Sequence, residues 1–301
     1  MNFVQPPDSV RGYLAELRRA LKGAARGLIA DALADCEEHL NMEIAQNPQL
    51  DEAAVMTSVV ETYGSPQEIA EEYRDMEASI TTPFPKQPEA DVAHGGGFFG
   101  VISDPRTYGA LLHMLLSLVT GIFYFTWTVV GLSISLGTSI LIFGVFFAIL
   151  FIASIRVLSH VEGRIVEALL GVRMPRRLPA PSAPDEKIWP RIKDALSDVR
   201  TWTSVLYLLL MLPLGIIYFT LGVVGLSLSL GVSGTSIYSL LTNESHIQIS
   251  YVPWLDHVFH TAPGLMLLAV AGILMFFVVL HMARFIGWTH GKIAEGLLVR
   301  L

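Results

Sequence analysis

Residues 107–155 read TYGALLHMLLSLVTGIFYFTWTVVGLSISLGTSILIFGVFFAILFIASI, and these 49 residues contain no Asp, Glu, Lys or Arg. A helix needs about 20 apolar residues to cross the hydrocarbon core of a bilayer. The block is therefore long enough for two crossings. We expect them at residues 109–135 and 139–158, with a turn at 135–139.

A second uncharged block lies between Arg200 and Glu244, and it predicts a third crossing at residues 203–230. The apolar segment 263–284 predicts a fourth. Only 16% of the chain is charged, against about 25% in an average soluble domain, and 52% is hydrophobic. The sequence predicts an all-α, multi-pass membrane protein with a four-helix transmembrane bundle.

The first 80 residues have a different pattern, because apolar residues recur there at helical spacing between charged ones. The run Gly64-Ser65-Pro66-Gln67-Glu68 has the residues of a helix end followed by a capping box. We predict a soluble bundle of about four short helices at residues 1–80. Residues 81–97 contain three prolines and end in three glycines, which favours a flexible linker.

The membrane part contains an internal repeat. Residues 121–126, Gly-Ile-Phe-Tyr-Phe-Thr, match residues 215–220, Gly-Ile-Ile-Tyr-Phe-Thr, at an offset of 94 residues. Residues 163–170 match residues 291–298 at an offset of 128, so the second copy carries a 34-residue insertion. We expect two parallel two-span repeats, at residues 98–175 and 192–301, joined by a cytosolic linker at 176–191, with an extracytoplasmic insertion at 232–262.

Basic residues indicate the orientation. They crowd the connection between the second and third crossings, whereas the segment after the third crossing has none before residue 284. The positive-inside rule then places this connection and both termini in the cytosol. The basic residues are Arg164, Arg173, Arg176, Arg177, Lys187, Arg191, Lys193 and Arg200.

The sequence offers no catalytic residue, cofactor site or metal site that we would assign. The predicted crossings hold no carboxylate and no Lys, which disfavours an ion-coupled transporter. Cys36 is the single cysteine, which excludes a disulfide framework. The net charge of -7 and the acidic N-terminus disfavour direct nucleic-acid binding. We expect that the protein is not an enzyme.

Three groups of residues are candidates for binding. The first is an exposed acidic face for a protein partner: Glu37, Glu38, His39, Glu71 and Glu72. The second is a ligand-binding seam between the repeats: Tyr124, Ser133, Ser135, Tyr218, Ser227 and Ser229. The third is an extracytoplasmic sensing loop: His246, Trp254, Asp256, His257 and His260. In this loop only His257 and His260 are closely spaced, and zinc needs three or four ligands, so we favour a segment lying on the outer leaflet.

Four basic side chains near the crossings have simple interpretations. We expect His113 and His281 to lie at an interface or to be hydrogen-bonded inside the bundle. Arg156 and Arg284 occupy matching positions of the two copies. Their long side chains could reach the lipid head groups without any further function.

Two family resemblances follow from these motifs. The N-terminal motifs, at residues 13–21, 35–40 and 63–73, resemble the HAAS signalling domain, which implies a cytosolic helical module of bacterial membrane proteins encoded beside PadR-type regulators. Both repeats resemble a bacterial sensor domain, with Asp-x-x-Thr-aromatic, Gly-Ile-x-Tyr-Phe and Gly-Arg/Lys-Ile motifs. The first copy departs from that pattern, since Tyr108 stands where Trp is usual.

The combined interpretation is a bacterial inner-membrane signalling protein. Its membrane part would sense a membrane lipid, a hydrophobic compound or the membrane state, and its N-terminal domain would control a PadR-like regulator. A small transporter or flippase accessory is the main alternative, and it requires a polar path lined by the seam residues. A third hypothesis is a structural homo-oligomer formed through Gly and Ser faces.

Overall fold

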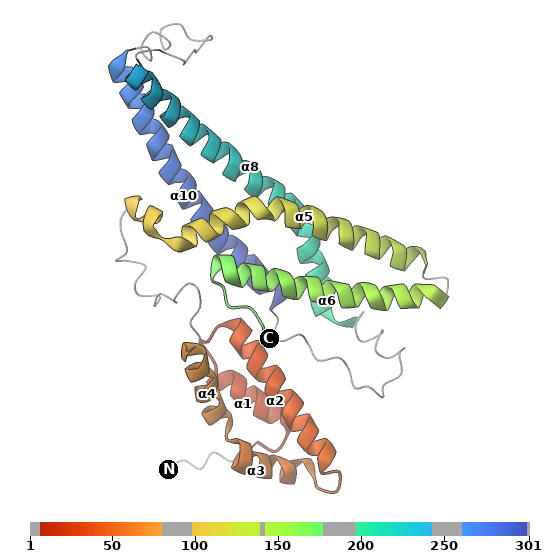
Figure 1. Cartoon of the computed structure of the whole chain (residues 1–301). Helices are drawn as coiled ribbons and strands as arrows, with labels where there is room; N and C mark the ends of the chain where they lie inside the picture. Colours follow the sequence, from red (N-terminus) through yellow and green to blue (C-terminus); the bar gives the residue numbers. More distant parts are fainter. Residues whose placement is uncertain (1–6, 80–97, 139–141, 177–196, 243–260, 300–301) are drawn as a thin grey trace. The chain divides into compact units, whose positions relative to one another are not determined.

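The computed structural model describes residues 7–79, 98–138, 142–176, 197–242 and 261–299. Over these residues every regular element is a helix (Figure 1), which confirms the prediction of an all-α chain. Four of the described helices are long and apolar enough to cross a membrane. The predicted number of membrane crossings is therefore matched, and the chain is a membrane protein.

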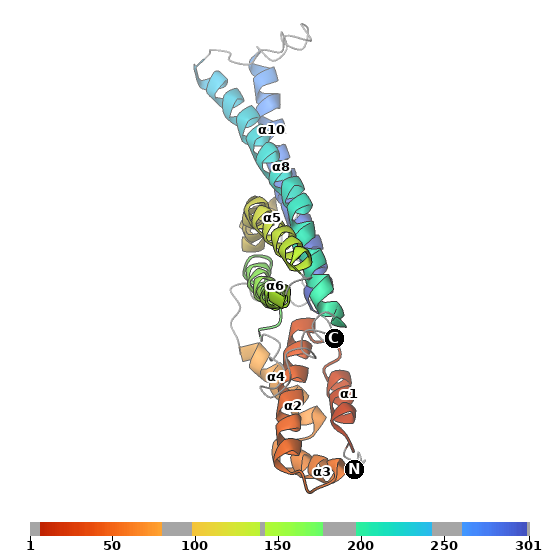
Figure 2. The ribbon, with the colours of Figure 1, turned by 90° about the vertical axis from the view of Figure 1, so that its right-hand side faces the viewer.

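The N-terminal bundle consists of α1 (Val10–Ala20), α2 (Arg26–Gln46), α3 (Glu52–Tyr63) and α4 (Pro66–Ser79) (Figures 1 and 2). Three of its helices, α1, α3 and α4, begin where the sequence provides a cap, because side-chain oxygens satisfy the first free N–H groups, whereas α2 begins after Ala25 without a side-chain cap. The Ser9 hydroxyl accepts a hydrogen bond from the Gly12 amide at 3.2 Å, and Asp51 accepts one from the Glu52 amide.

The predicted capping box between α3 and α4 is present. The Ser65 amide donates to the Glu68 carboxylate at 2.8 Å, and the Glu68 amide donates to the Ser65 hydroxyl at 3.3 Å. The hydrogen bond from the Ser65 amide foremost, and then the Ser65 hydroxyl beside the carboxylate, hold the pKa of Glu68 below its ordinary value. Gly64 ends α3 at a φ of 115°, a conformation that a side chain would strain.

The core of the bundle is formed by the apolar stripes of its four helices. The Tyr13 hydroxyl donates to the Gly64 carbonyl at 2.9 Å, which ties α1 to the end of α3. Cys36 is fully buried, and burial raises the pKa of its thiol to about 11. Met76, which the helical spacing places inward, is instead half exposed. The buried core residues are Tyr13, Leu17, Leu21, Ile29, Ala32, Cys36, Leu40, Val55, Met56, Val59, Ile69 and Ala70.

The four long helices are α5 (Pro105–Gly137), α6 (Ile142–Leu170), α8 (Val199–Thr242) and α10 (Ala262–Leu298), and a 3-10 helix, η2 (Phe98–Ser103), precedes α5. Each long helix exceeds the crossing predicted for it. With 44 residues, α8 is about 66 Å long, whereas the hydrocarbon core is about 30 Å thick. Hydropathy identifies only the part of a helix that lies in lipid. Residues 232–242, which we predicted to belong to the extracytoplasmic insertion, are instead the end of α8.

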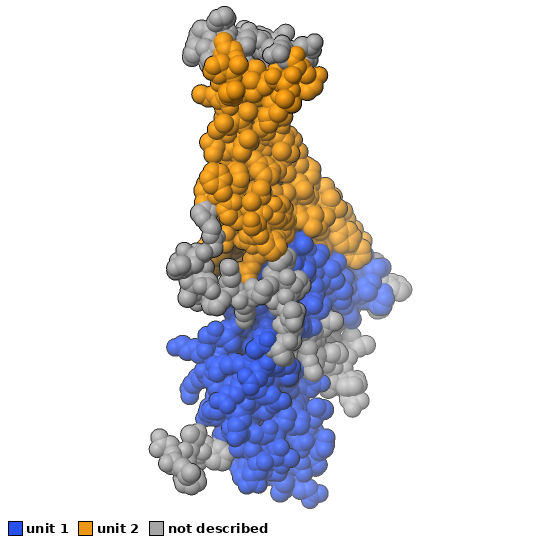
Figure 3. All heavy atoms as spheres, turned by 60° about the vertical axis from the view of Figure 1, so that its left-hand side comes forward, with its two compact units in different colours: residues 1–85, 135–206, 293–301 blue, residues 86–134, 207–292 orange. Residues whose placement is uncertain are grey.

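The chain divides into two compact units (Figure 3): residues 1–85, 135–206 and 293–301, and residues 86–134 and 207–292. The first unit combines the N-terminal bundle with α6, and the second contains most of α5, α8 and α10. In the second unit α8 and α10 lie side by side (Figures 1 and 2). Small residues permit their close approach, since a methyl group added to Gly272 would lie 2.7 Å from the Ser233 amide nitrogen.

Candidate functional site

The acidic side chains proposed for partner binding lie on the surface of the N-terminal bundle. Glu37 and Glu38 are exposed on α2, and Glu71 and Glu72 are exposed on α4. His39 is half-buried, because its ring stacks on Tyr63 with 4.3 Å between the ring centroids. These positions are compatible with a partner surface.

The six seam residues have different environments. Tyr124 and Tyr218 are buried, as are Ser135 and Ser229, whereas Ser133 and Ser227 are exposed. Ser229 is buried where α8 meets α10, because its carbonyl oxygen lies 3.0 Å from the position of a methyl group on Gly272. This contact lies within the second repeat rather than between the repeats.

The five residues of the extracytoplasmic loop, His246, Trp254, Asp256, His257 and His260, lie outside the described residues. Within the ranges the structure describes, no group of three or more His, Cys, Asp or Glu side chains could hold a metal ion.

Two glycines bring the backbones of α5 and α8 into contact. A methyl group on Gly121 would lie 2.5 Å from the Met211 carbonyl oxygen, and one on Gly215 would lie 2.3 Å from the Ser117 carbonyl oxygen. Gly121 and Gly215 are 94 residues apart, and so are Ser117 and Met211. The two copies of the repeat therefore make the same contact in both directions, and only glycine fits there.

A group of polar side chains is buried between α5, α8 and α10. The rings of His113 and His290 lie 4.5 Å apart between centroids, and the Tyr207 hydroxyl is hydrogen-bonded to His290 Nε2 at 2.9 Å. The Tyr218 ring meets His290 edge-on at 5.6 Å. His113 is 1% exposed and His290 is fully buried. We call His113, Tyr207, Tyr218 and His290 the polar cluster.

The polar cluster is incompletely hydrogen-bonded. Among the described residues, neither ring nitrogen of His113 has a hydrogen-bond partner, and neither does His290 Nδ1. A buried polar atom without a partner costs about 1–3 kcal/mol. His113 lies inside the bundle, which is one of the two places expected for it, but the hydrogen bond expected there is absent among the described residues.

His290 and Tyr207 are not among the candidates predicted from the sequence, although the repeat contains a signal for both. Tyr207 corresponds to His113 at the offset of 94, and His290 corresponds to Glu162 at the offset of 128. All four side chains are fully or almost fully buried in their own surroundings. Polar residues at equivalent positions of both copies, inside apolar helices, could have singled them out.

His281 is hydrogen-bonded to the backbone: its Nε2–H donates to the Phe98 carbonyl at 3.0 Å, and its ring stacks on Phe98. A structural role accounts for it.

The two arginines at matching positions have carboxylate partners. Arg284 lies 3.4 Å from Asp104, and Arg156 lies 3.9 Å from Asp198. Asp104 and Asp198 are themselves equivalent at the offset of 94. Each pair joins the start of the first helix of one repeat to the second helix of the other. The two arginines, which we expected only to reach the lipid head groups, therefore also have ion-pair partners. All four side chains are partly exposed, so each pair contributes little stability.

The N-terminal bundle holds the segment that follows α6 by a buried arginine. The Arg173 guanidinium donates to Asp31 of α2 at 2.8 Å and to both carboxylate oxygens of Glu77 of α4 at 3.1 Å. It also donates to the Met174 carbonyl. The three charged side chains are at most 10% exposed. We call Asp31, Glu77 and Arg173 the arginine junction.

The backbone of this segment also fits the bundle closely. A methyl group on Gly27 would lie 2.7 Å from the Arg173 carbonyl oxygen, so only glycine admits the segment against α2. The Arg176 amide donates to Asp31 at 2.9 Å, and the Arg176 side chain pairs with Glu167 of α6 at 3.1 Å. In the sequence, Arg173 and Arg176 indicate only the orientation of the chain. The sequence did contain a signal for this contact, because Asp31 is a carboxylate on the same face of α2 as the buried Leu28 and Ala32.

Comparison with protein families agrees with this architecture. The HAAS family model matches residues 12–72. The Sensor family model, described as "Putative sensor", matches residues 113–298, which is more than half of the chain. The chain belongs to this sensor family, and it is a membrane sensor protein with an N-terminal HAAS domain. No curated protein and no solved structure matches the chain.

Proposed function

We propose that this protein is a bacterial signalling protein of the inner membrane that controls a PadR-type transcriptional regulator through its HAAS domain. The membrane helices respond to a membrane-associated or hydrophobic stimulus, and both termini lie in the cytosol. The observation that carries the proposal is the arginine junction. It gives a change in the membrane helices a direct route to α2 and α4 of the HAAS domain.

The route has few components. Arg173 lies three residues after the end of α6, and Arg176 is paired with Glu167 inside α6. A rotation or shift of α6 therefore moves the guanidinium that Asp31 and Glu77 share. Because a buried arginine that loses its carboxylates is strongly unfavourable, the HAAS domain follows the movement or releases the segment.

The polar cluster is the element that we expect to respond. Buried imidazoles with unused nitrogens favour any alternative packing that gives them a partner. A ligand or a lipid head group with hydrogen-bonding groups would have this effect. The duplicated repeat places the cluster beside the crossing of α5 and α8, where Gly222 packs on Met114 and Leu115.

Transcript profiles test the proposal. The full-length chain, its Arg173→Ala variant and an Arg164→Ala control are each expressed in cells lacking the chromosomal copy. Arg164 forms an exposed pair with Glu167, so its loss leaves the junction intact. Genes bound by a PadR-type regulator should change when the chain is deleted, change similarly with Arg173→Ala, and keep their wild-type level with Arg164→Ala. Unchanged transcripts after deletion would exclude regulatory control.

The alternative hypotheses predict other measurements. A transporter or flippase accessory needs a hydrated path between the repeats, and the backbone contact at Gly121 and Gly215 favours a dry seam instead. Cysteine scanning of Tyr124 and Tyr218 with a water-soluble thiol reagent would reveal such a path. A structural homo-oligomer requires more than one copy per particle in detergent or nanodiscs.

A further inference from the structure

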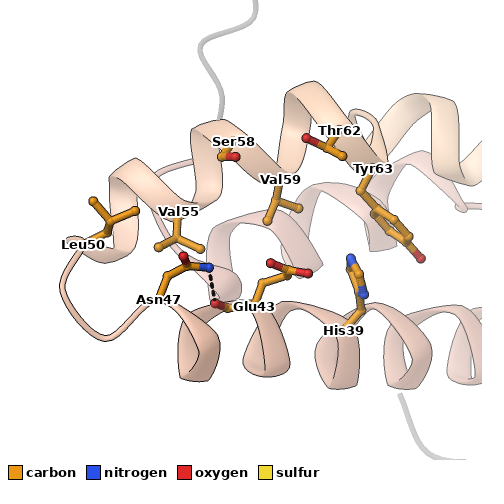
Figure 4. Close-up of a pocket in the computed structure, with 9 residues that line it drawn as sticks. All are labelled: His39, Glu43, Asn47, Leu50, Val55, Ser58, Val59, Thr62 and Tyr63. Atoms are coloured by element: carbon orange, nitrogen blue, oxygen red, sulfur yellow. Dashed lines mark hydrogen bonds between the residues drawn. The ribbon is translucent and has the colours of Figure 1, made fainter.

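The HAAS domain has a cleft between α2 and α3 that the arginine junction does not use (Figure 4). Val55 and Val59 form its buried base, and the stacked rings of His39 and Tyr63 close one end. Glu43 and Leu50 line it from α2 and from the loop before α3, and Leu50 is 55% exposed. An apolar base with a carboxylate in its wall is thus open to solvent.

The size of the cleft indicates what it can accept. Its volume is about 220 Å³, below the range of about 300–1,000 Å³ for small-molecule sites. It can take one large apolar side chain, and protein interfaces commonly place such an anchor in a pocket at their centre. A protein segment fits it better than a metabolite.

The charge around the cleft indicates which kind of segment it would bind. Between Arg26 and Arg74 the sequence contains 11 Asp and Glu residues and no Lys or Arg, and this stretch includes every residue that lines the cleft. Among the described residues no cation is paired with Glu43. An apolar anchor flanked by Lys or Arg would meet complementary charge, which favours its encounter and orientation.

The position of the cleft on α2 connects it to the arginine junction. Asp31 and Glu43 lie 12 residues apart on one helix of 21 residues, a separation of about 18 Å. The N-terminal half of α2 holds Arg173, and its C-terminal half forms a wall of the cleft. A partner in the cleft and the segment after α6 can therefore bind α2 at the same time.

From these observations we propose that the α2–α3 cleft is the docking site for the regulator, which inserts one bulky apolar side chain flanked by basic residues. This inference rests on the proposed function, because it names the surface by which the HAAS domain would hold the PadR-type regulator. It assigns the binding to the cleft rather than to the exposed acidic face as a whole.

Site-specific photo-crosslinking in cells tests the proposal on the full-length chain. Benzoylphenylalanine replaces Leu50 at the rim or, as a control, Thr57, which the helical spacing places on the opposite side of α3 from Val55 and Val59. We expect a PadR-type regulator to be crosslinked at Leu50 at least tenfold more than at Thr57, through a peptide with an apolar residue next to Lys or Arg.

Different failures have different meanings. Regulator adducts that form equally at both positions, or only at Thr57, would overturn the cleft assignment and leave the proposed function standing. Adducts at Leu50 with lipid or with a second copy of this chain would also overturn it. Absence of the regulator from both positions, with unchanged transcripts in the deletion experiment, would refute the proposed function and this inference together.

Binding of the purified regulator to the full-length chain in nanodiscs provides a second measurement. Ser58→Trp fills the cleft, whereas Thr57→Trp adds the same side chain on the other side of α3. Glu43→Lys reverses a charge in the cleft, whereas Glu61→Lys does so elsewhere on α3. We expect the Kd to rise at least tenfold for Ser58→Trp and Glu43→Lys and less than threefold for the two controls. Equal effects of each variant and its control would contradict docking in the cleft.

Discussion

Replacement of Arg173 by alanine removes the cation shared by two buried carboxylates. Asp31 and Glu77 are then left with side chains at most 10% exposed and without the guanidinium that pairs them. Asp31 retains the Arg176 amide as a donor at 2.9 Å, whereas among the described residues the Glu77 carboxylate accepts hydrogen bonds from Arg173 alone. The variant therefore leaves buried carboxylates without the cation that neutralises them, which costs more than the loss of a surface contact.

The expected magnitude follows from that difference. Removal of one partner of a buried ion pair costs about 3–5 kcal/mol, whereas an exposed pair is worth about 0–1 kcal/mol. The ratio of docked to released HAAS domain should thus fall by roughly two to three and a half orders of magnitude in Arg173→Ala. It should fall by less than about tenfold in the Arg164→Ala control, which loses only an exposed pair with Glu167.

Pulsed electron–electron spin resonance in nanodiscs measures this release. Spin labels on Ala34→Cys in α2 and Ala168→Cys in α6, in a Cys36→Ala background, report the distance between the two helices within the first unit. We expect a narrow distribution for the wild-type sequence and for Arg164→Ala, and a broad one for Arg173→Ala. Arg173→Glu, which adds a third carboxylate, should broaden it further.

One result would refute the reasoning. If Arg173→Ala and Arg173→Glu both kept a distribution as narrow as that of the wild type, the arginine junction would not hold the HAAS domain. The proposed route from α6 to the HAAS domain would then lose its physical basis.

Three further predictions concern the bundle and the helix crossing. Glu68→Ala should lower the melting temperature of the HAAS domain at neutral pH, and because the native pKa of Glu68 is depressed, the difference from wild type should shrink as the pH falls below about 4.3 in pH-dependent thermal melts. With a thiol pKa of about 11, Cys36 should react with iodoacetamide at pH 8 at least a hundredfold more slowly in the native chain than in the denatured chain, and equal rates would contradict the burial of the thiol. The stability that comes from this raised pKa should be lost as the pH rises from about 8.5 towards 11. Gly121→Val should lower thermal stability in nanodiscs by about 1–3 kcal/mol, whereas Gly231→Ala, which meets nothing within 4 Å, should leave it unchanged or raise it slightly; equal effects would argue against the backbone contact of α5 with α8.

The sequence by itself determined the number and approximate location of the membrane helices. The cost of a charge in hydrocarbon leaves long gaps between charged residues, and these gaps can be read without any structure. The capping box at Ser65 and Glu68 was predictable for a similar reason, because its hydrogen bonds join residues three apart. Helix ends beyond the lipid were not predictable from hydropathy. The predicted crossing therefore ended at residue 230, whereas α8 continues to Thr242.

Only the tertiary structure decided which polar residues come together. Asp31 and Arg173 are 142 residues apart, and although Asp31 stands on the apolar face of its helix, its local sequence does not say which cation it meets. His113 and His290 come from different helices, and their partnership depends on the packing of α5 against α10. Helical periodicity gives the face of a residue but not the helix that covers it, because packing is set by shape and charge complementarity between distant segments. The candidate sites of this protein depend on such contacts, whereas its membrane architecture depends on local composition.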